Sequence, residues 1–175
     1  MRIIKDVLIE DQAEHLRQKF INAEWSRYDR TKEGLYIGKD SWYPGEDEVY
    51  SSNYCRARAV EKSPEFHEIA QKLAQFLRDG FEIRQAACFA YRMIAGDHFR
   101  VHDDSDNGIG FVYYLSKDWK WDWGGLLMVR HKDGIVSLKP EFNQMVIIDY
   151  GVPHFVTPVT TYAKEARYAL VGFGK

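Results

Sequence analysis

Long apolar runs are absent from this sequence, and cysteine is scarce. No stretch of about eighteen consecutive apolar residues occurs, so we expect no transmembrane helix. The first residues also lack the apolar core and the small-residue cleavage site of a signal peptide. The two cysteines, Cys55 and Cys88, match no metal-binding spacing, and we expect them to stay reduced. The sequence therefore predicts a cytoplasmic protein without a membrane span.

An excess of charge of either sign is also absent. The 24 basic and 26 acidic side chains give a formal net charge of −2, which argues against a general nucleic-acid-binding protein. Hydrophobic residues make up 45% and aromatic residues 15% of the chain, a composition that disordered proteins lack. A chain of 175 residues can bury a core of its own, so we expect one domain spanning residues 1–175.

Helical spacing of apolar residues is confined to the first eighty residues, roughly, where a short strand over 2–9 precedes two helices. Asp11 is the expected N-cap of the first helix, and Glu14, three residues on, completes a capping box. The second helix begins at Ser63-Pro64, with serine as the cap and proline at the first position. It ends at Asp79-Gly80.

After residue 80 the pattern changes to short strands separated by turns rich in Gly, Asp and Asn. Two helices followed by strands favour an α+β fold, with a jelly-roll core over 81–175 and N-terminal helices packed on its outside. Residues 1–80 then provide helical support, and the aromatic segment 26–55 is typical of a lid or binding loop. The expected strands lie near residues 82–93, 98–103, 109–116, 125–131, 135–138, 144–149, 154–159 and 166–173.

The most informative pattern is His102-x-Asp104 followed, later in the chain, by His154. Residues two apart in a strand face the same side, so His102 and Asp104 can reach one metal ion together. In a rolled sheet, the strand that begins at His154 can lie beside them. Two imidazoles and one carboxylate take one face of an octahedral metal and leave the opposite face open, as in the facial triad of non-haem Fe(II) oxygenases. The three residues therefore predict a metal site.

A fixed cation follows this pattern. Arg167 opens the last apolar run of the chain, which extends to Phe173. The planar fork of a guanidinium matches a carboxylate, so Arg167 suits the distal carboxylate of a chelating 2-oxo acid. Without the three preceding residues, an exposed strand cation would be the ordinary interpretation, and the order of all four carries the prediction.

With these motifs in order, the chain resembles the 2-oxoglutarate and Fe(II)-dependent oxygenases, and most closely their prolyl 4-hydroxylase-like branch. The resemblance covers about residues 81–175 and implies a double-stranded β-helix, in agreement with the strand pattern. The motifs that carry it are Gly96-Asp97-His98-Phe99-Arg100-Val101-His102-Asp103-Asp104, Phe111-Val112-Tyr113-Tyr114-Leu115, Gly124-Gly125-Leu126-Leu127, Pro140-Glu141-Phe142-Asn143, His154-Phe155-Val156-Thr157-Pro158-Val159 and Arg167-Tyr168-Ala169-Leu170.

The resemblance implies a role for each site residue. It implies that Fe(II) is bound by His102, Asp104 and His154, with 2-oxoglutarate as cosubstrate and L-ascorbate as a further cofactor candidate. It also implies that Arg167 pairs with the distal carboxylate of 2-oxoglutarate, that Tyr114 hydrogen-bonds the same cosubstrate, and that Tyr91 lines the pocket.

Two positions depart from the family pattern. The spacer between His154 and Arg167 is longer than in close relatives, which leaves Lys164 as an alternative anchor for the carboxylate. We prefer Arg167, because the residues after it match the family strand and its fork suits a carboxylate. Met93 stands where many members carry a tyrosine.

The implied activity is dioxygen-dependent hydroxylation of an unactivated C–H bond. Family members that halogenate lack the carboxylate of the triad, so Asp104 favours hydroxylation. The expected substrate is a prolyl residue in a peptide or protein, with a free amino acid or small metabolite as the alternative. Two other classes remain open: a cupin-like metalloenzyme without 2-oxoglutarate, and a non-catalytic jelly-roll binding module.

Overall fold

The computed structural model describes residues 1–28, 54–83, 86–104 and 108–175. Most of the expected lid segment, 26–55, lies outside these residues; only its two ends are described. Within the described residues, no helix combines the length and the apolarity that crossing a membrane requires.

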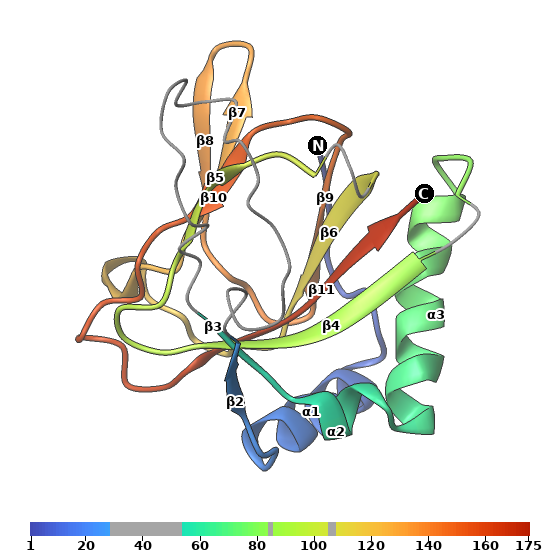
Figure 1. Ribbon diagram of the computed structural model, residues 1–175, viewed down its shortest axis with the longest axis vertical. Helices are drawn as coiled ribbons and strands as arrows, with labels where there is room; N and C mark the ends of the chain where they lie inside the picture. The colour runs from blue at the N-terminus through green and yellow to red at the C-terminus, as the bar shows by residue number, and fades with distance from the viewer. Residues whose placement is uncertain (29–53, 84–85, 105–107) are drawn as a thin grey trace.

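The described residues form short strands, three α-helices and one 3-10 helix, η1, at Trp121–Trp123 (Figure 1). The α-helices are α1 (Glu10–Ile21), α2 (Arg58–Glu61) and α3 (Pro64–Arg78). The strands are β1 (Arg2–Ile4), β2 (Ser26–Tyr28), β3 (Tyr54–Arg56), β4 (Ala86–Met93), β5 (Phe99–His102), β6 (Ile109–Tyr114), β7 (Leu127–His131), β8 (Gly134–Leu138), β9 (Gln144–Ile148), β10 (His154–Val156) and β11 (Arg167–Gly174).

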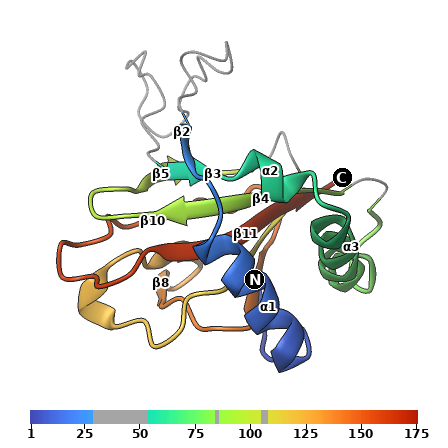
Figure 2. The same cartoon turned by 90° about the horizontal axis from the view of Figure 1, so that it is seen from below.

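The strands form two sheets in which the neighbouring strands are antiparallel. The larger sheet has seven strands in the order β1-β9-β6-β11-β4-β3-β2, and the smaller has four in the order β5-β10-β7-β8. The three α-helices lie on the side of the molecule away from the smaller sheet, as Figure 1 and Figure 2 both show. The expectation that short strands dominate the chain after residue 80 is confirmed, and these strands pair in antiparallel fashion.

Of the two expected helix N-caps, the structure confirms the one of α3 but not the one of α1. Ser63 caps α3 as expected, accepting a hydrogen bond from the amide of Phe66, and Pro64 is the first helical residue. For α1 the expected cap is wrong: the helix begins at Glu10, ahead of Asp11, and no side chain caps it. Glu14 instead pairs with Lys117 and Arg17, because a carboxylate gains more from cations within reach than from an amide already in the helix.

Some strands are shorter than the sequence predicts. β4 begins at Ala86 rather than near residue 82, and β10 ends at Val156 rather than near residue 159. The short strands β2 and β3 are not expected from the sequence, because three residues are too few to display an alternating pattern.

Alternation along the larger sheet separates two apolar clusters. On β6, Tyr113 faces the cluster that α1 and α3 share with the sheet, whereas Tyr114 faces the cluster that both sheets share. The hydroxyl of Tyr113 donates to the side-chain oxygen of Asn143 at 2.8 Å. Side chains on successive strand residues point to opposite faces, which confirms that only one of the two tyrosines faces the region of the expected site.

Candidate metal and cosubstrate site

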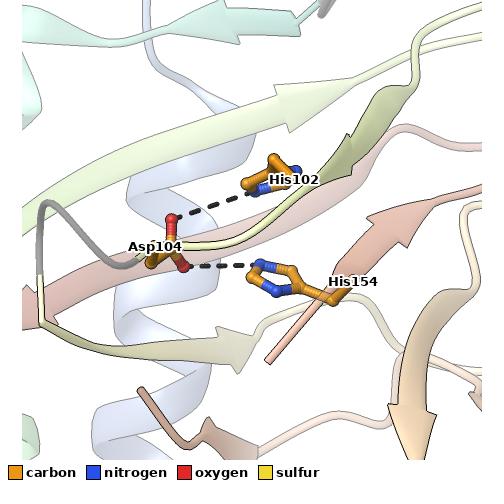
Figure 3. Close-up of side chains that lie close together, drawn as sticks. All are labelled: His102, Asp104 and His154. Carbon is orange, nitrogen blue, oxygen red and sulfur yellow. Dashed lines mark ion pairs between the residues drawn. The ribbon is translucent and has the colours of Figure 1, made fainter. Parts of the chain in front are cut away.

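Three side chains from two segments of the chain converge between the two sheets (Figure 3). His102 ends β5, Asp104 follows two residues later, and His154 begins β10, directly opposite His102 in the antiparallel register. Their ligand atoms all lie within 4.8 Å of one another. Alternation puts His102 and Asp104 on one side of the chain, and pairing of β5 with β10 supplies the third member.

Both imidazoles turn the same nitrogen toward the carboxylate. Nε2 of His154 lies 3.4 Å from Oδ2 of Asp104, and Nε2 of His102 lies 3.9 Å from its Oδ1. The opposite nitrogens, Nδ1, lie 2.7 Å and 2.9 Å from the backbone oxygens of Arg100 and Val152. A carbonyl oxygen only accepts, so Nδ1 carries the proton and Nε2 keeps the lone pair with which an imidazole binds a metal.

This donor set fits a divalent transition metal. Imidazole nitrogen and carboxylate oxygen are suitable ligands for iron, and the site offers two imidazoles and one carboxylate. The second nitrogen of each histidine is held by a backbone carbonyl, the feature that orients metal-binding imidazoles. Asp104 and His154 are 9% and 7% exposed, so a bound ion would be shielded from solvent on this side.

A buried cation lies at the other end of the same interior region. Arg167, the first residue of β11, is 2% exposed, and its guanidinium lies 5.1 Å from the ring centroid of Tyr114. Its Nη1 lies 3.4 Å from the sulfur of Met93, which faces it across the β11–β4 pairing. Burial lowers the pKa of Arg167 and raises that of Tyr114, because both charged forms lose hydration.

The polar groups of Arg167 and Tyr114 are incompletely satisfied. Nε of Arg167 and the hydroxyl of Tyr114 are buried without a hydrogen-bond partner. Across the described ranges, no carboxylate forms an ion pair with Arg167. Buried polar groups are normally paired, so these two mark a place where a ligand oxygen would complete the structure.

The neighbours of Arg167 explain why this residue is inside. Gly125 has no side chain, and a Cβ there would lie 2.9 Å from Cδ of Arg167. Lys164, the alternative anchor, is exposed and so does not reach the interior. The structure therefore brings Arg167 and Tyr114 together and leaves Lys164 outside.

Tyr91 lies on the same inward face of β4 as Met93, two residues from it. It is 5% exposed and packs with Tyr54, at 4.4 Å between ring centroids, and with Phe99, at 5.7 Å. Phe99 in turn lies 6.2 Å from the ring of His102. The structure places Tyr91 in an aromatic group beside the histidines, whereas Met93 is the β4 residue that contacts Arg167.

The contact of Met93 with Arg167 is not predicted from the sequence. The alternation predicts that Phe89, Tyr91 and Met93 share one face of β4. The partner of each one, however, depends on the register between β4 and β11, which the local pattern does not define.

Comparison with known proteins identifies the family. Residues 88–175, half of the chain, match the model of the 2OG-Fe(II) oxygenase superfamily. The chain belongs to this superfamily: it is a 2-oxoglutarate-dependent dioxygenase whose cofactors are Fe(II) and 2-oxoglutarate. The membership sets aside a cupin-like enzyme without 2-oxoglutarate and a non-catalytic module. No curated protein matches the chain.

Solved structures share the fold at low sequence identity. A Pseudomonas putida prolyl-4-hydroxylase superposes with a TM-score of 0.70 at 17% identity, covering 99% of this chain and 91% of that one. A Trichoplax adhaerens prolyl hydroxylase, in complex with a hypoxia inducible factor peptide fragment, has a TM-score of 0.69, 18% identity and coverages of 99% and 82%. HygX from Streptomyces hygroscopicus, with nickel and 2-oxoglutarate bound, has a TM-score of 0.65, 12% identity and coverages of 98% and 81%.

Proposed function

We propose that His102, Asp104 and His154 hold the Fe(II) of this dioxygenase. One observation carries the proposal: three ligand atoms lie within 4.8 Å of one another, with Nδ1 of both histidines already engaged by backbone oxygens. In this proposal residues 1–175 form one domain. The two sheets form its double-stranded β-helix, or jelly roll, and the N-terminal helices cover the outside.

Arg167 is the proposed partner of the distal carboxylate of 2-oxoglutarate, with Tyr114 as a hydrogen-bond donor to the same group. The support is electrostatic, because an unpaired buried cation and an unpaired buried hydroxyl lie side by side. With one carboxylate in the metal site and a dianionic cosubstrate, the charges of ion, Asp104, cosubstrate and Arg167 cancel. Buried charges persist where they are paired in this way.

In this proposal the protein binds the ion and the cosubstrate and excludes water from the site. Fe(II), when bound, supplies the activation of dioxygen that hydroxylates an unactivated C–H bond. His102, Asp104 and His154 would hold the ion through three protein ligands, which would leave it able to bind the cosubstrate and dioxygen as well. Arg167 fixes the cosubstrate at its far end, and the cluster that both sheets share keeps water away. In family members that halogenate, the carboxylate is missing, and its presence here favours hydroxylation.

The proposed substrate is a prolyl residue in a peptide or protein. Two solved structures of the same fold are prolyl hydroxylases, and one holds a peptide. Phe99, which is partly exposed, lies beside His102 and offers apolar surface for a saturated ring, and the buried Tyr54 and Tyr91 pack against it. A small metabolite is the second candidate, because HygX has been solved with hygromycin B bound.

Turnover tests the proposal directly. Purified protein is incubated with Fe(II), 2-oxoglutarate and ascorbate against a panel of proline-containing peptides, free amino acids and small metabolites. We expect succinate release that requires both Fe(II) and 2-oxoglutarate, and a product heavier by one oxygen from a proline-containing peptide. Oxygen gain confined to free amino acids or metabolites would replace the first substrate class with the second. Succinate release unaffected by loss of Asp104 would refute the ligand assignment.

A further inference from the structure

A glycine lies directly against the carboxylate of the triad. Gly110 is the second residue of β6, and a Cβ built on it would lie 2.7 Å from Oδ2 of Asp104. The next nearest atoms are Cγ of Asp104 at 3.7 Å and Cδ1 of Phe173 at 3.9 Å, which are ordinary contacts. A side chain at this position would therefore collide with one group only, the carboxylate oxygen nearest His154.

The backbone at Gly110 has little freedom to move away. β6 is an inner strand of the larger sheet, and Gly110 pairs with Ile148 of β9 on one side and Phe173 of β11 on the other. Its φ lies outside the left-handed region, so the conformation itself does not require glycine. What requires glycine is the close approach of another group, a common reason for glycine inside a strand.

Asp104 is not held by a strand of its own. It follows the last residue of β5, and its backbone oxygen accepts a hydrogen bond from the amide of Gly108 at 2.9 Å. Its side-chain oxygens face Nε2 of His154 at 3.4 Å and Nε2 of His102 at 3.9 Å. The position of the carboxylate therefore depends on what it packs against, and Gly110 forms that surface.

We propose that Gly110 is a positioning residue for Asp104. The missing side chain leaves the space that Oδ2 occupies and so sets its 3.4 Å separation from Nε2 of His154. A methyl group at residue 110 would displace the carboxylate, because the paired strand cannot yield, and would open the triad. The inference rests on the proposed metal site.

Cobalt binding tests the role of Gly110 without turnover. Co(II) is titrated anaerobically into the full-length apoprotein and followed by calorimetry and visible absorption. Gly110→Ala should weaken Co(II) binding about 10- to 100-fold, the usual effect of losing the support of a metal ligand. Its Co(II) absorption should also change.

A second glycine offers a matched control. Gly174 lies on the neighbouring strand β11 with an equally close obstacle, because a Cβ there would lie 2.6 Å from Cδ1 of Ile83. That obstacle is apolar and lies away from the triad. Gly174→Ala should keep Co(II) affinity within about twofold of the unmodified protein. Equal losses in the two variants would overturn the inference, because both would then reflect a general disturbance of the sheet.

A double variant separates positioning from folding. Gly110→Ala should lower the apoprotein melting temperature when Asp104 is present and leave it unchanged in the Asp104→Ala background, because the only colliding group is gone. An equal drop in both backgrounds would overturn the inference, even if the single variant fails to fold. If Asp104→Ala binds Co(II) normally, the proposed metal site fails. If Asp104→Ala loses Co(II) and Gly110→Ala folds and retains it, only the role of Gly110 fails.

Discussion

The two ends of the candidate site hold their charged groups in opposite ways. In the triad, Asp104 lies near Nε2 of both imidazoles, so the three proposed metal ligands are close together before any ion arrives. At the far end, Arg167 is more deeply buried, and none of the described carboxylates pairs with it. The triad can form without a cosubstrate, whereas Arg167 lacks its counter-charge until an anion enters.

The difference indicates that burying Arg167 lowers the stability of the apoprotein and raises its affinity for an anion. A buried cation without a partner costs several kcal/mol in desolvation, roughly, and a bound carboxylate offsets that cost. The seven-stranded sheet supplies the rigidity that makes this possible, because Arg167 lies in a strand paired on both sides along most of its length. Substitutions at the two ends should therefore differ in their effects on turnover, on 2-oxoglutarate affinity and on the stability of the apoprotein.

The largest effect is expected at the triad. Asp104→Ala removes the carboxylate of the triad, so 2-oxoglutarate turnover should fall by at least about 100-fold, the upper end of what losing an outer-shell partner costs. Succinate release measures it. Asp133→Ala, which removes an exposed carboxylate on the β7–β8 connection, should retain turnover. Comparable turnover in the two variants would mean that Asp104 is not a ligand of the catalytic metal.

At the far end, Arg167→Met should separate binding from stability. Losing the buried partner of a carboxylate costs about 3 kcal/mol, so the Kd of 2-oxoglutarate should rise by about two orders of magnitude. Stability of the apoprotein should be unchanged or higher, because an unpaired buried charge is replaced by an apolar chain of similar length. Calorimetric binding in the presence of Mn(II) and thermal unfolding of the apoprotein measure the two quantities.

Arg167→Lys provides the intermediate case. It keeps the charge and loses the planar fork, so its affinity for 2-oxoglutarate should lie between those of the unmodified protein and Arg167→Met. A clear loss of apoprotein stability in Arg167→Met would contradict the description of Arg167 as a cation awaiting an anion.

Removal of the metal should show how the ends cooperate. Mn(II) at about 100 times its Kd should add about 2.7 kcal/mol, or roughly 5–10 °C in melting temperature. A further rise with 2-oxoglutarate should need both the ion and Arg167, because the proposed cosubstrate position spans them. Differential scanning fluorimetry with and without EDTA measures this. A 2-oxoglutarate shift that survives EDTA unchanged would mean that the cation binds the anion without the triad.

A smaller effect is expected at Gly125. The Cβ of Gly125→Ala would press on Cδ of Arg167 at 2.9 Å, and a displacement costing about 1 kcal/mol would raise the Kd of 2-oxoglutarate about fivefold. Mn(II) affinity should be unaffected. Gly96→Ala controls for backbone strain, since its φ of 89° is also positive but nothing lies within 4 Å of its Cβ position. Equal losses of 2-oxoglutarate affinity in both variants would assign the effect to strain.

The smallest effect is expected for Glu14, a charged residue that lies outside the candidate site and contributes to stability. Hydrogen bonds from Lys117 and Gln18 lower the pKa of Glu14 to about 2, so its contribution is present above the ordinary pKa near 4.5 and is lost as pH falls toward 2. The side chain is partly solvated, which limits the contribution to about 1 kcal/mol. Urea unfolding of Glu14→Gln should show this loss at pH 7 and almost none at pH 2, with 2-oxoglutarate affinity unchanged. A deficit of equal size at pH 2 would contradict the assignment.

The comparison also shows what the sequence predicts well. His102 and Asp104 are close because residues two apart share a strand face, a local property. The convergence of His154 on them agrees with the order of the motifs, and the burial of Arg167 agrees with its place in the last apolar run. Ser63-Pro64 is likewise a local signal, and the structure confirms it.

Contacts that depend on strand register are not predictable in this way. The meeting of Met93 with Arg167 depends on how β4 and β11 align, and Gly110 lies against Asp104 because β6 passes beside the end of β5. Asp11 is not the cap of α1, because the helix already begins at Glu10 and Asp11 is its second residue. The sequence thus predicts which side chains face inward, and the pairing of strands decides what each one meets.

Diffraction at the iron absorption edge, from crystals grown anaerobically with Fe(II) and 2-oxoglutarate, tests the central claim most directly. We predict one anomalous peak bonded to Nε2 of His102, Nε2 of His154 and a carboxylate oxygen of Asp104, with the far carboxylate of 2-oxoglutarate against Arg167. An iron peak bonded to other residues, or a cosubstrate that leaves Arg167 unpaired, would contradict the account.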